Sequence, residues 1–356
     1  MLEKNKQEVS NVSDSFVQLA NGNINYYGLG YNDVKAICRD VVRQELAIVT
    51  KEATNTFQQE ISAFEDQFVS RLEKLENPQV MEKLRTPKLQ FALHDTMKEY
   101  AKTDDENTKE DLVDLLIERL KVNEHTTEQY LIDECIKVLP NLSLYQTYFL
   151  GALTLRKVIN QGYSFVVSNN LGKRGMLYEH LDSITNLDIH YLKLANCCSD
   201  MSGTKYYLPI LDIMKPDYDL LFRHHITEEA YNAFIHSHPN VPSQKGQQLV
   251  YRKGNTNEIY LFYSSRRFLI QELNKKNIHY SLSEIDELIN LFTPFTNDVI
   301  KQHLISLNSN WGKAFVCYDK EEVTHIDLTP VGTYIGRRIV KKVTKDDTLP
   351  LEEFYK

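Results

Sequence analysis

The sequence lacks the long apolar runs and leader segments that mark membrane or secreted proteins. No run reaches the roughly 18 apolar residues that a membrane helix needs, and the best candidate, residues 142–159, is interrupted by polar and basic side chains. Residues 1–6 have no apolar core of the kind found in signal peptides. We therefore expect a cytoplasmic protein without membrane contacts.

Cysteine is scarce, and the familiar catalytic motifs are missing. The five cysteines are an odd number without a C-x-x-C spacing, which favours neither a disulfide framework nor a zinc site. No H-E-x-x-H or G-x-S-x-G motif occurs. Residues 172–175 (GKRG) place their basic residues between the glycines, unlike a P-loop, so a surface turn is favoured. The sequence predicts no catalytic residues and no cofactor.

Basic residues are also few in the N-terminal part. Residues 1–150 carry 17 Lys and Arg against 26 Asp and Glu, whereas the remainder carries 24 against 23. An acidic surface repels phosphate groups, so any contact with nucleic acid is expected in the C-terminal part. The acidic side chains at positions 110, 111, 114 and 118 alternate with leucines, which favours a solvated helix face.

The clearest positive signal is a long helix that ends before Pro78. Residues 31–76 contain no Pro or Gly, and apolar residues recur at steps of three and four. Either the rest of the chain or further copies must cover this apolar stripe, because an exposed stripe of that size causes association. We favour a homo-oligomer. The predicted interface residues are Leu46, Val49, Ala53, Phe57, Ile61, Phe64 and Phe68.

Together, the patterns predict a mainly α (α+β) protein with five regions. These are a disordered segment (1–13), a β-hairpin at Asn21-Gly22 with the long helix (14–78), a helical bundle (79–162), a mixed α/β region (163–257) and a winged-helix-like α/β domain (258–356).

The winged-helix interpretation rests on the order of elements near the C-terminus. After two helices, residues 314–318 and 323–328 have strand-like composition and would form a two-stranded wing. Thr329 and Pro330 then begin a last helix as its cap and first turn. Two further strands are predicted at residues 164–168 and 205–214. Winged helices bind either DNA or proteins.

Two groups of side chains are candidates for a binding site. Arg337, Arg338, Lys341 and Lys342 form a basic patch on the last helix, for which a structural or protein-binding role is favoured over contact with nucleic acid. His224, His225, His236 and His238 form a histidine cluster, with His236 and His238 on one side of an extended segment. Since no further ligand has a defining spacing, a polar helix-end region is favoured over a metal site.

Three stretches carry a resemblance to a known family. Residues 22–46 (GNINYYGLGYNDVKAICRDVVRQEL), residues 87–120 (PKLQFALHDTMKEYAKTDDENTKEDLVDLLIERL) and residues 327–340 (DLTPVGTYIGRRIV) resemble an uncharacterised bacterial family, the LPO/Vpar type. The first stretch also looks like the start of some abortive-infection proteins from bacterial defence islands. The resemblance supplies no catalytic residues, and residues 164–257 lie outside it.

Three hypotheses about function follow. The favoured one is a non-enzymatic, oligomeric factor of bacterial anti-phage defence that recognises a phage or host protein. The second is a winged-helix regulator that binds DNA through the basic patch. The third is a metal-dependent hydrolase or nuclease that uses the histidine cluster.

Overall fold

The computed structural model describes residues 35–40, 51–75, 83–84, 86–156, 158, 162–203, 206–239, 241–242 and 248–345. The chain divides into two compact units, Met1–His94 and Asp95–Lys356, and the border between them falls inside one helix.

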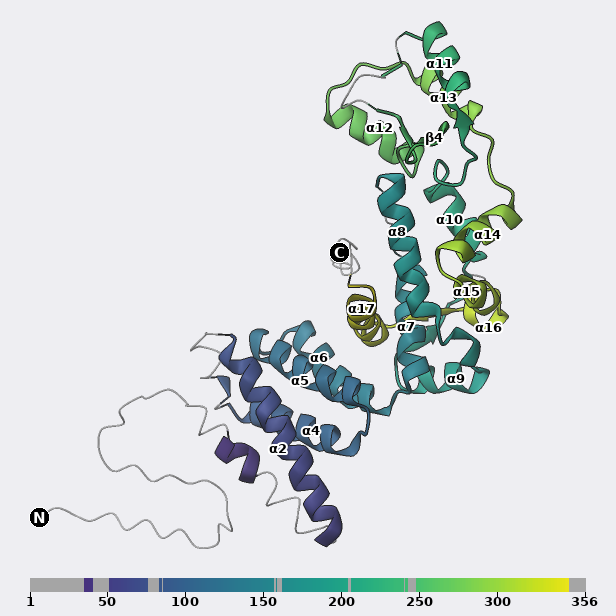
Figure 1. Ribbon diagram of the computed structural model, residues 1–356. Coiled ribbons are helices and arrows are strands. Elements are labelled where there is room, and N and C mark those ends of the chain that lie inside the picture. Colours follow the sequence, from purple (N-terminus) through teal and green to yellow (C-terminus); the bar gives the residue numbers. More distant parts are fainter. Residues whose placement is uncertain are drawn as a thin grey trace, which may run out of the picture. The chain divides into compact units, whose positions relative to one another are not determined.

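Helices make up most of the described chain (Figure 1). In the first unit, residues 35–40 are helical and α2 spans Lys51–Glu73, while α4 (Pro87–Lys102) crosses the border. The second unit continues with α5 (Glu106–Lys121), α6 (Thr127–Val138), η1 (Leu139–Asn141), α7 (Leu144–Arg156), α8 (Ser164–Arg174), η2 (Gly175–Tyr178), η3 (Leu181–Ser183), α9 (Asn186–Leu194), β1 (Cys198–Asp200), α10 (Ile210–Asp217), β2 (Ile226–Thr227), α11 (Glu228–Ser237), β3 (Val250–Arg252), β4 (Glu258–Leu261), α12 (Arg266–Lys275), α13 (Leu282–Leu291), α14 (Asn297–Leu307), α15 (Trp311–Tyr318), α16 (Glu321–Thr324), β5 (Ile326–Leu328) and α17 (Pro330–Thr344). With only small sheets among these helices, the predicted fold class is confirmed. None of the described helices has both the length and the apolarity needed to cross a membrane.

The helix α2 buries the centre of the predicted stripe within the single chain. Ile61 is 2% exposed, and Phe64 and Phe68 are fully buried and stacked with their ring centroids 5.6 Å apart. Phe57 is half-buried. Because the chain itself covers the three buried side chains, they no longer require a second copy, and an oligomer interface on this helix stays a prediction.

Several predictions about the N-terminal region fall outside the described residues. These are the disorder of residues 1–13, the hairpin at 14–30, and the interface positions Leu46 and Val49. The side chain of Ala53 and the continuity of the helix across residues 41–50 also lie outside them.

The bundle helices of the second unit begin where the sequence places polar caps. Asp105 caps α5 by accepting from the backbone N–H of Thr108, and Thr126 caps α6 by accepting from that of Gln129. At the other end of the chain Thr329 caps α17, with Pro330 in its first turn, as predicted. These side chains satisfy N–H groups that have no partner inside the helix.

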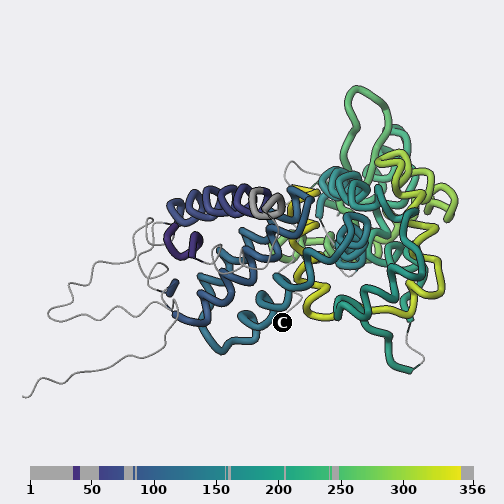
Figure 2. Tube along the Cα trace, turned by 90° about the horizontal axis from the view of Figure 1, so that it is seen from below, coloured from purple at the N-terminus to yellow at the C-terminus, as the bar shows by residue number. Residues whose placement is uncertain are grey.

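The last helix is part of the bundle rather than of a separate C-terminal domain. The helix α17, at the yellow end of the trace in Figure 2, packs along α7 and α6, although it is far from them in sequence. The two backbones approach closely at Gly336, where a Cβ atom would overlap Thr154 Oγ1 and lie 2.5 Å from the Leu150 carbonyl oxygen. Only glycine fits between these backbones without moving one of the helices.

The winged-helix prediction is wrong, because the segment expected to form the first strand of the wing is helical. The helix α15 (Trp311–Tyr318) buries Trp311, Ala314, Phe315 and Tyr318, a helical spacing. The Trp311 indole donates to the Leu171 carbonyl (3.0 Å) and the Tyr318 hydroxyl donates to the Ala152 carbonyl (2.6 Å). These contacts with α7 and α8 outweigh the strand propensity of the aromatic and β-branched residues.

The second predicted strand is only partly correct. Residues 323–324 belong to the helix α16, and Ile326–Leu328 pairs antiparallel with β1 rather than with a neighbouring strand of a wing. Arg156 at the end of α7 holds this turn. Its guanidinium donates to the carbonyls of Val323 (3.0 Å) and Ile326 (2.8 Å) and lies 3.5 Å from the Tyr207 ring centroid.

Two other predicted strands are also helical. Residues 164–168 belong to α8, whose buried positions Ser164, Val167, Asn170, Leu171 and Arg174 follow a helical period. Part of the segment 205–214 belongs to α10. In both segments the periodic burial of side chains overrides the local β propensity.

The middle of the second unit contains a small α/β lobe. The strands β2, β4 and β3 form an antiparallel sheet in that order, and Figure 1 shows α11, α12 and α13 near β4. The strands β3 and β4 form an antiparallel hairpin, and the helix α12 follows β4 in the sequence. A cluster of buried side chains, which includes Leu261, Leu273 and Phe292, forms the core of the lobe.

Candidate functional site

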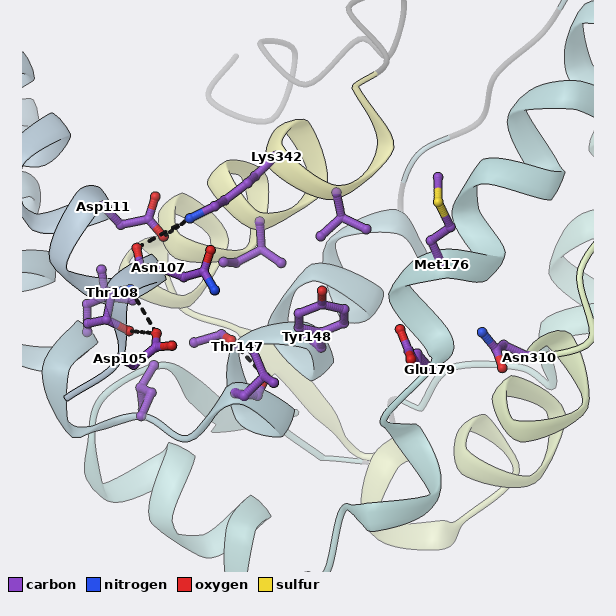
Figure 3. A pocket seen from close by; sticks show the side chains of 15 residues that line it. Asp105, Asn107, Thr108, Asp111, Thr147, Tyr148, Met176, Glu179, Asn310 and Lys342 are labelled. Atoms are coloured by element: carbon purple, nitrogen blue, oxygen red, sulfur yellow. Dashed lines mark hydrogen bonds and ion pairs between the residues drawn. The ribbon is translucent and has the colours of Figure 1, made fainter. Parts of the chain in front are cut away.

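A half-open cavity of about 470 Å³ lies in the second unit. This volume falls within the range of small-molecule sites. Elements from distant parts of the sequence form its wall: the start of α5, η1, α7, η2, the residue before α15, and α17. The lining residues are Asp105, Asn107, Thr108, Asp111, Leu139, Leu142, Leu144, Thr147, Tyr148, Met176, Glu179, Asn310, Ile339, Lys342 and Val343. Figure 3 shows its polar side chains at two ends, with Thr147 and Tyr148 between them.

At the first end, which we call the paired end, the polar groups satisfy one another. The Asp105 carboxylate accepts from the N–H (2.8 Å) and the hydroxyl (2.6 Å) of Thr108. Lys342 Nζ lies 3.4 Å from Asp111 Oδ2 and 3.3 Å from the Asn107 carbonyl oxygen (Figure 3). The paired end therefore has little capacity left for a ligand.

The two carboxyl groups of the paired end have opposite pKa shifts. For Asp105 burial raises the pKa, but the hydrogen bonds from Thr108 outweigh burial and the pKa lies below its ordinary value. For Asp111 burial is the largest effect and raises the pKa, despite the opposing charges of Lys342 and Arg338. The charges of Lys342 and Arg338 favour the ionised form of Asp111, which burial disfavours.

The paired end continues into a charged contact between α5 and α17. Arg338 Nη1 lies 2.6 Å from Glu118 Oε1, and Arg338 Nη2 lies 3.7 Å from a carboxylate oxygen of both Asp111 and Asp114. The Tyr334 hydroxyl donates to Glu118 Oε2 at 2.5 Å. Burial lowers the pKa of Arg338, but the effect of these carboxylates is larger in sum and the pKa lies above its ordinary value. The guanidinium therefore stays charged.

This contact joins two groups that the sequence analysis had treated separately. The acidic face of α5 was expected to be solvated, yet Asp111 is 8% exposed and faces α17. Of the predicted basic patch, Arg338 and Lys342 face these carboxylates, Arg337 is half-buried and Lys341 is exposed. A contact of the patch with nucleic acid stays a prediction, although Arg338 and Lys342 already face carboxylates of the chain itself.

At the second end, which we call the open end, polar side chains lack internal partners. In the described part of the chain, the Tyr148 hydroxyl has no hydrogen-bond partner, the Glu179 carboxylate has no ion pair, and the Asn310 amide makes no side-chain hydrogen bond. Figure 3 shows Glu179 and Asn310 at this end, on the side of Met176, with Tyr148 between them and the paired end. Burial, and next the charge of Glu179, raise the pKa of Tyr148, so its hydroxyl stays protonated.

The open end is held in place by contacts outside the cavity. The edge of the His180 ring packs on Tyr148 with ring centroids 4.9 Å apart. The Glu179 carbonyl accepts from Lys313 Nζ at 2.6 Å, and the backbone N–H of Asn310 donates to Asn308 Oδ1 at 3.0 Å. These contacts hold the Tyr148 ring and the backbone at Glu179 and Asn310.

The predicted histidine cluster does not form a metal site. His236 lies in the helix α11 rather than on an extended segment, and His238 stacks on Phe234 (ring centroids 4.0 Å apart) and lies 3.0 Å from Glu287. His224 packs against Phe295, and His225 lies 3.5 Å from Glu258. Among the residues that the structure describes, no three His, Cys, Asp or Glu side chains come close enough to hold a metal ion.

The cysteines are buried and lack nucleophilic character. Burial raises the pKa of Cys38, Cys197 and Cys198 to about 12 and that of Cys317 to about 11, and the pKa of Cys135 is raised as well. The thiolate is the reactive form of cysteine, and these thiols stay protonated at neutral pH.

The open end was missed in the sequence because its residues carry no motif. Tyr148, Glu179 and Asn310 come from α7, the turn after η2 and the turn before α15. One signal was present: residues 144–148 place exposed aromatic and apolar side chains within a capped bundle helix, and Leu144 and Tyr145 are 45% and 44% exposed. Exposed apolar groups of this kind often line binding sites.

A protein-family model matches residues 28–354. The family is described only as "-like", and the description names no activity. The match includes residues 164–257. No curated protein and no solved structure matches the chain. Because the match covers nearly the whole chain, the protein belongs to this uncharacterised family.

Proposed function

We propose that this protein is an oligomeric factor of bacterial anti-phage defence, of the abortive-infection kind, that acts by recognising a phage or host protein. It acts by binding and not by catalysis. The likeness of residues 22–46 to the start of abortive-infection proteins supports the defence role.

The observation that carries the binding role is the open end of the cavity. Its tyrosine hydroxyl, carboxylate and amide are held by the surrounding backbone and lack partners among the described residues. Groups left unpaired at a fixed site are suited to binding a complementary ligand. The Tyr148 hydroxyl does not have the character of an activated nucleophile, since its pKa is raised rather than lowered.

The structure differs from the features on which the two alternative functions were predicted. A winged-helix regulator needs the two-stranded wing, which is replaced by α15 and a strand that pairs with β1. A metal-dependent hydrolase needs imidazoles that converge, whereas His225 and His238 lie against carboxylates of other elements. We therefore do not propose either activity.

The defence role is tested by expressing the full chain in bacteria and plating a broad phage panel. We expect reduced plating or arrested growth of infected cells for at least one phage. Tyr148→Ala should abolish the effect, and Tyr130→Ala, at a 56% exposed tyrosine outside the cavity, should retain it. If the folded wild-type protein gives neither protection nor arrest with any phage, the proposal is wrong.

Assembly is tested by the solution mass from light scattering. Phe57→Asp introduces a charge at a half-buried position of α2, whereas Thr56→Asp makes the same change at an exposed neighbour. We expect an oligomer that Phe57→Asp dissociates and Thr56→Asp preserves. A monomeric wild-type protein would contradict the assembly proposal.

A further inference from the structure

We propose that the open end of the cavity binds a primary alkylammonium group, the chemistry of a lysine side chain on the recognised protein. This inference rests on the proposed function, because it specifies what the recognition site takes.

The charge of the cavity favours a cation. Of the three carboxyl groups that line the cavity, those of Asp105 and Asp111 are engaged at the paired end, whereas that of Glu179 has no ion pair among the described residues. Lys342 lies at the paired end, close to Asp111. The nearby Lys313 engages the Glu179 carbonyl and the Asp182 carboxylate rather than the Glu179 side chain. An anion at the open end would meet an uncompensated carboxylate, whereas a cation would be attracted.

The arrangement of oxygens favours ammonium over guanidinium. An ammonium group has three donors and no acceptor, and the side chains of Tyr148, Glu179 and Asn310 each bring an oxygen to the cavity lining. A guanidinium group is planar and pairs best with one carboxylate in a two-pronged geometry, which leaves the other two oxygens less well placed.

The wall beside these oxygens suits the methylene chain of the ligand. Met176 and Leu144 line the cavity and are 37% and 45% exposed, so their apolar atoms contact solvent when no ligand is bound. Covering them with methylene groups removes apolar surface from water. A lysine side chain combines a four-carbon stem with a charged end, and so can use both the apolar and the oxygen-bearing parts of the lining.

The test uses the purified full chain and short capped peptides. A peptide with a central lysine (Ac-Ala-Lys-Ala-amide) is compared by NMR titration with analogues that carry norleucine, Nε-acetyl-lysine or arginine at that position. We expect the lysine peptide to bind about tenfold more tightly than the norleucine and acetyl-lysine peptides, since they lose the charge-assisted hydrogen bonds. Arginine should bind more weakly than lysine.

Variants assign the binding to the open end. Glu179→Gln should weaken binding of the lysine peptide about tenfold, and Tyr148→Phe should weaken its binding by a smaller factor. Glu128→Gln makes the same chemical change at an exposed carboxylate outside the cavity and should leave binding unchanged. Because Tyr148→Phe retains the ring, it tests the site even if Glu179→Gln fails to fold. Equal binding of the lysine and norleucine peptides, or undiminished binding by both cavity variants, would overturn the inference.

Butylamine as a third probe separates two sources of the ammonium group. Weaker binding of butylamine than of the lysine peptide indicates a protein-borne lysine, and tighter binding of butylamine would overturn that source.

The plating assay separates this inference from the proposed function. If Glu179→Gln loses the peptide yet still protects against phage, the lysine site fails as the recognition element while the defence role stands.

Discussion

The two ends of the cavity contain similar side chains but differ in what those side chains already bind. At the paired end Asp105, Asp111 and Lys342 are engaged by one another, by Thr108 and by Arg338. At the open end Tyr148 and Glu179 have no such partners in the described chain. The difference shows that the availability of a charge, rather than its presence, decides where a ligand binds.

The largest expected effect comes from the wall that both ends share. Gly336→Val would force α17 away from α7, because the added side chain meets Thr154 and the Leu150 carbonyl. We expect a loss of about 3 kcal/mol of unfolding free energy, measured by urea denaturation, together with loss of peptide binding. The matched control is Gly312→Ala in α15, where an added Cβ meets nothing within 4 Å. If Gly336→Val is as stable as wild type, the close packing of α7 and α17 is wrong.

Sequence patterns found the helices whose ends carry polar caps, but missed helices defined by tertiary contacts. The cap Thr329 marks α17, whose start was predicted from this residue and from Pro330. The helix α15 was mistaken for a strand because its composition is β-like, and its buried spacing depends on contacts with α7 and α8. Local propensity is weak compared with such burial.

The candidate site was less predictable than the fold for a related reason. The acidic face of α5 and the basic residues of α17 were both recognised, but their pairing joins positions that are far apart in sequence. Sequence alone shows that Arg338 is charged and does not show that Glu118 already binds it. The open end has no charge pattern at all and depends wholly on how α7, η2 and α15 meet.

The second prediction contrasts one glutamate of the α5–α17 contact with one at the open end. Glu118→Gln removes a charge that faces the Arg338 guanidinium, whose side chain is 15% exposed, and we expect a loss of about 1–2 kcal/mol. Glu179→Gln removes a charge without an ion pair among the described residues and should change stability by less than about 0.5 kcal/mol. Urea denaturation of both variants measures the difference, and a larger loss for Glu179→Gln would reverse the comparison.

The third prediction concerns pH and separates the two carboxyl groups of the paired end. The pKa of Asp105 is lower in the folded chain, so its contribution to stability is present above 3.8 and is lost as the pH falls through the folded pKa. The pKa of Asp111 is raised, so its contribution is largest below 3.8 and decreases as the pH rises through the folded pKa.

Thermal unfolding over a pH series that spans 3.8 checks these signs. Asp105→Asn retains a capping side chain and should lose less stability on acidification than wild type does. Asp111→Asn should lose more stability on acidification than wild type does. Identical pH profiles for the two variants would show that the two groups do not differ in this way.

The smallest expected effect on stability belongs to the open end. Tyr148→Phe removes a hydroxyl that has no hydrogen-bond partner in the described chain, while the ring keeps its contact with His180. The melting temperature should therefore stay close to that of wild type, although peptide binding weakens. A clear loss of thermal stability would reveal a structural role for the hydroxyl.

The central claim is that the open end of the cavity serves recognition in phage defence. The most direct measurement is the efficiency of plating, over one phage panel, on cells that express wild type, Glu179→Gln or Glu128→Gln at equal levels of folded protein. We predict protection by wild type and Glu128→Gln and its loss in Glu179→Gln. Equal protection by all three proteins would contradict the role of the open end, and no protection by folded wild type would contradict the defence function.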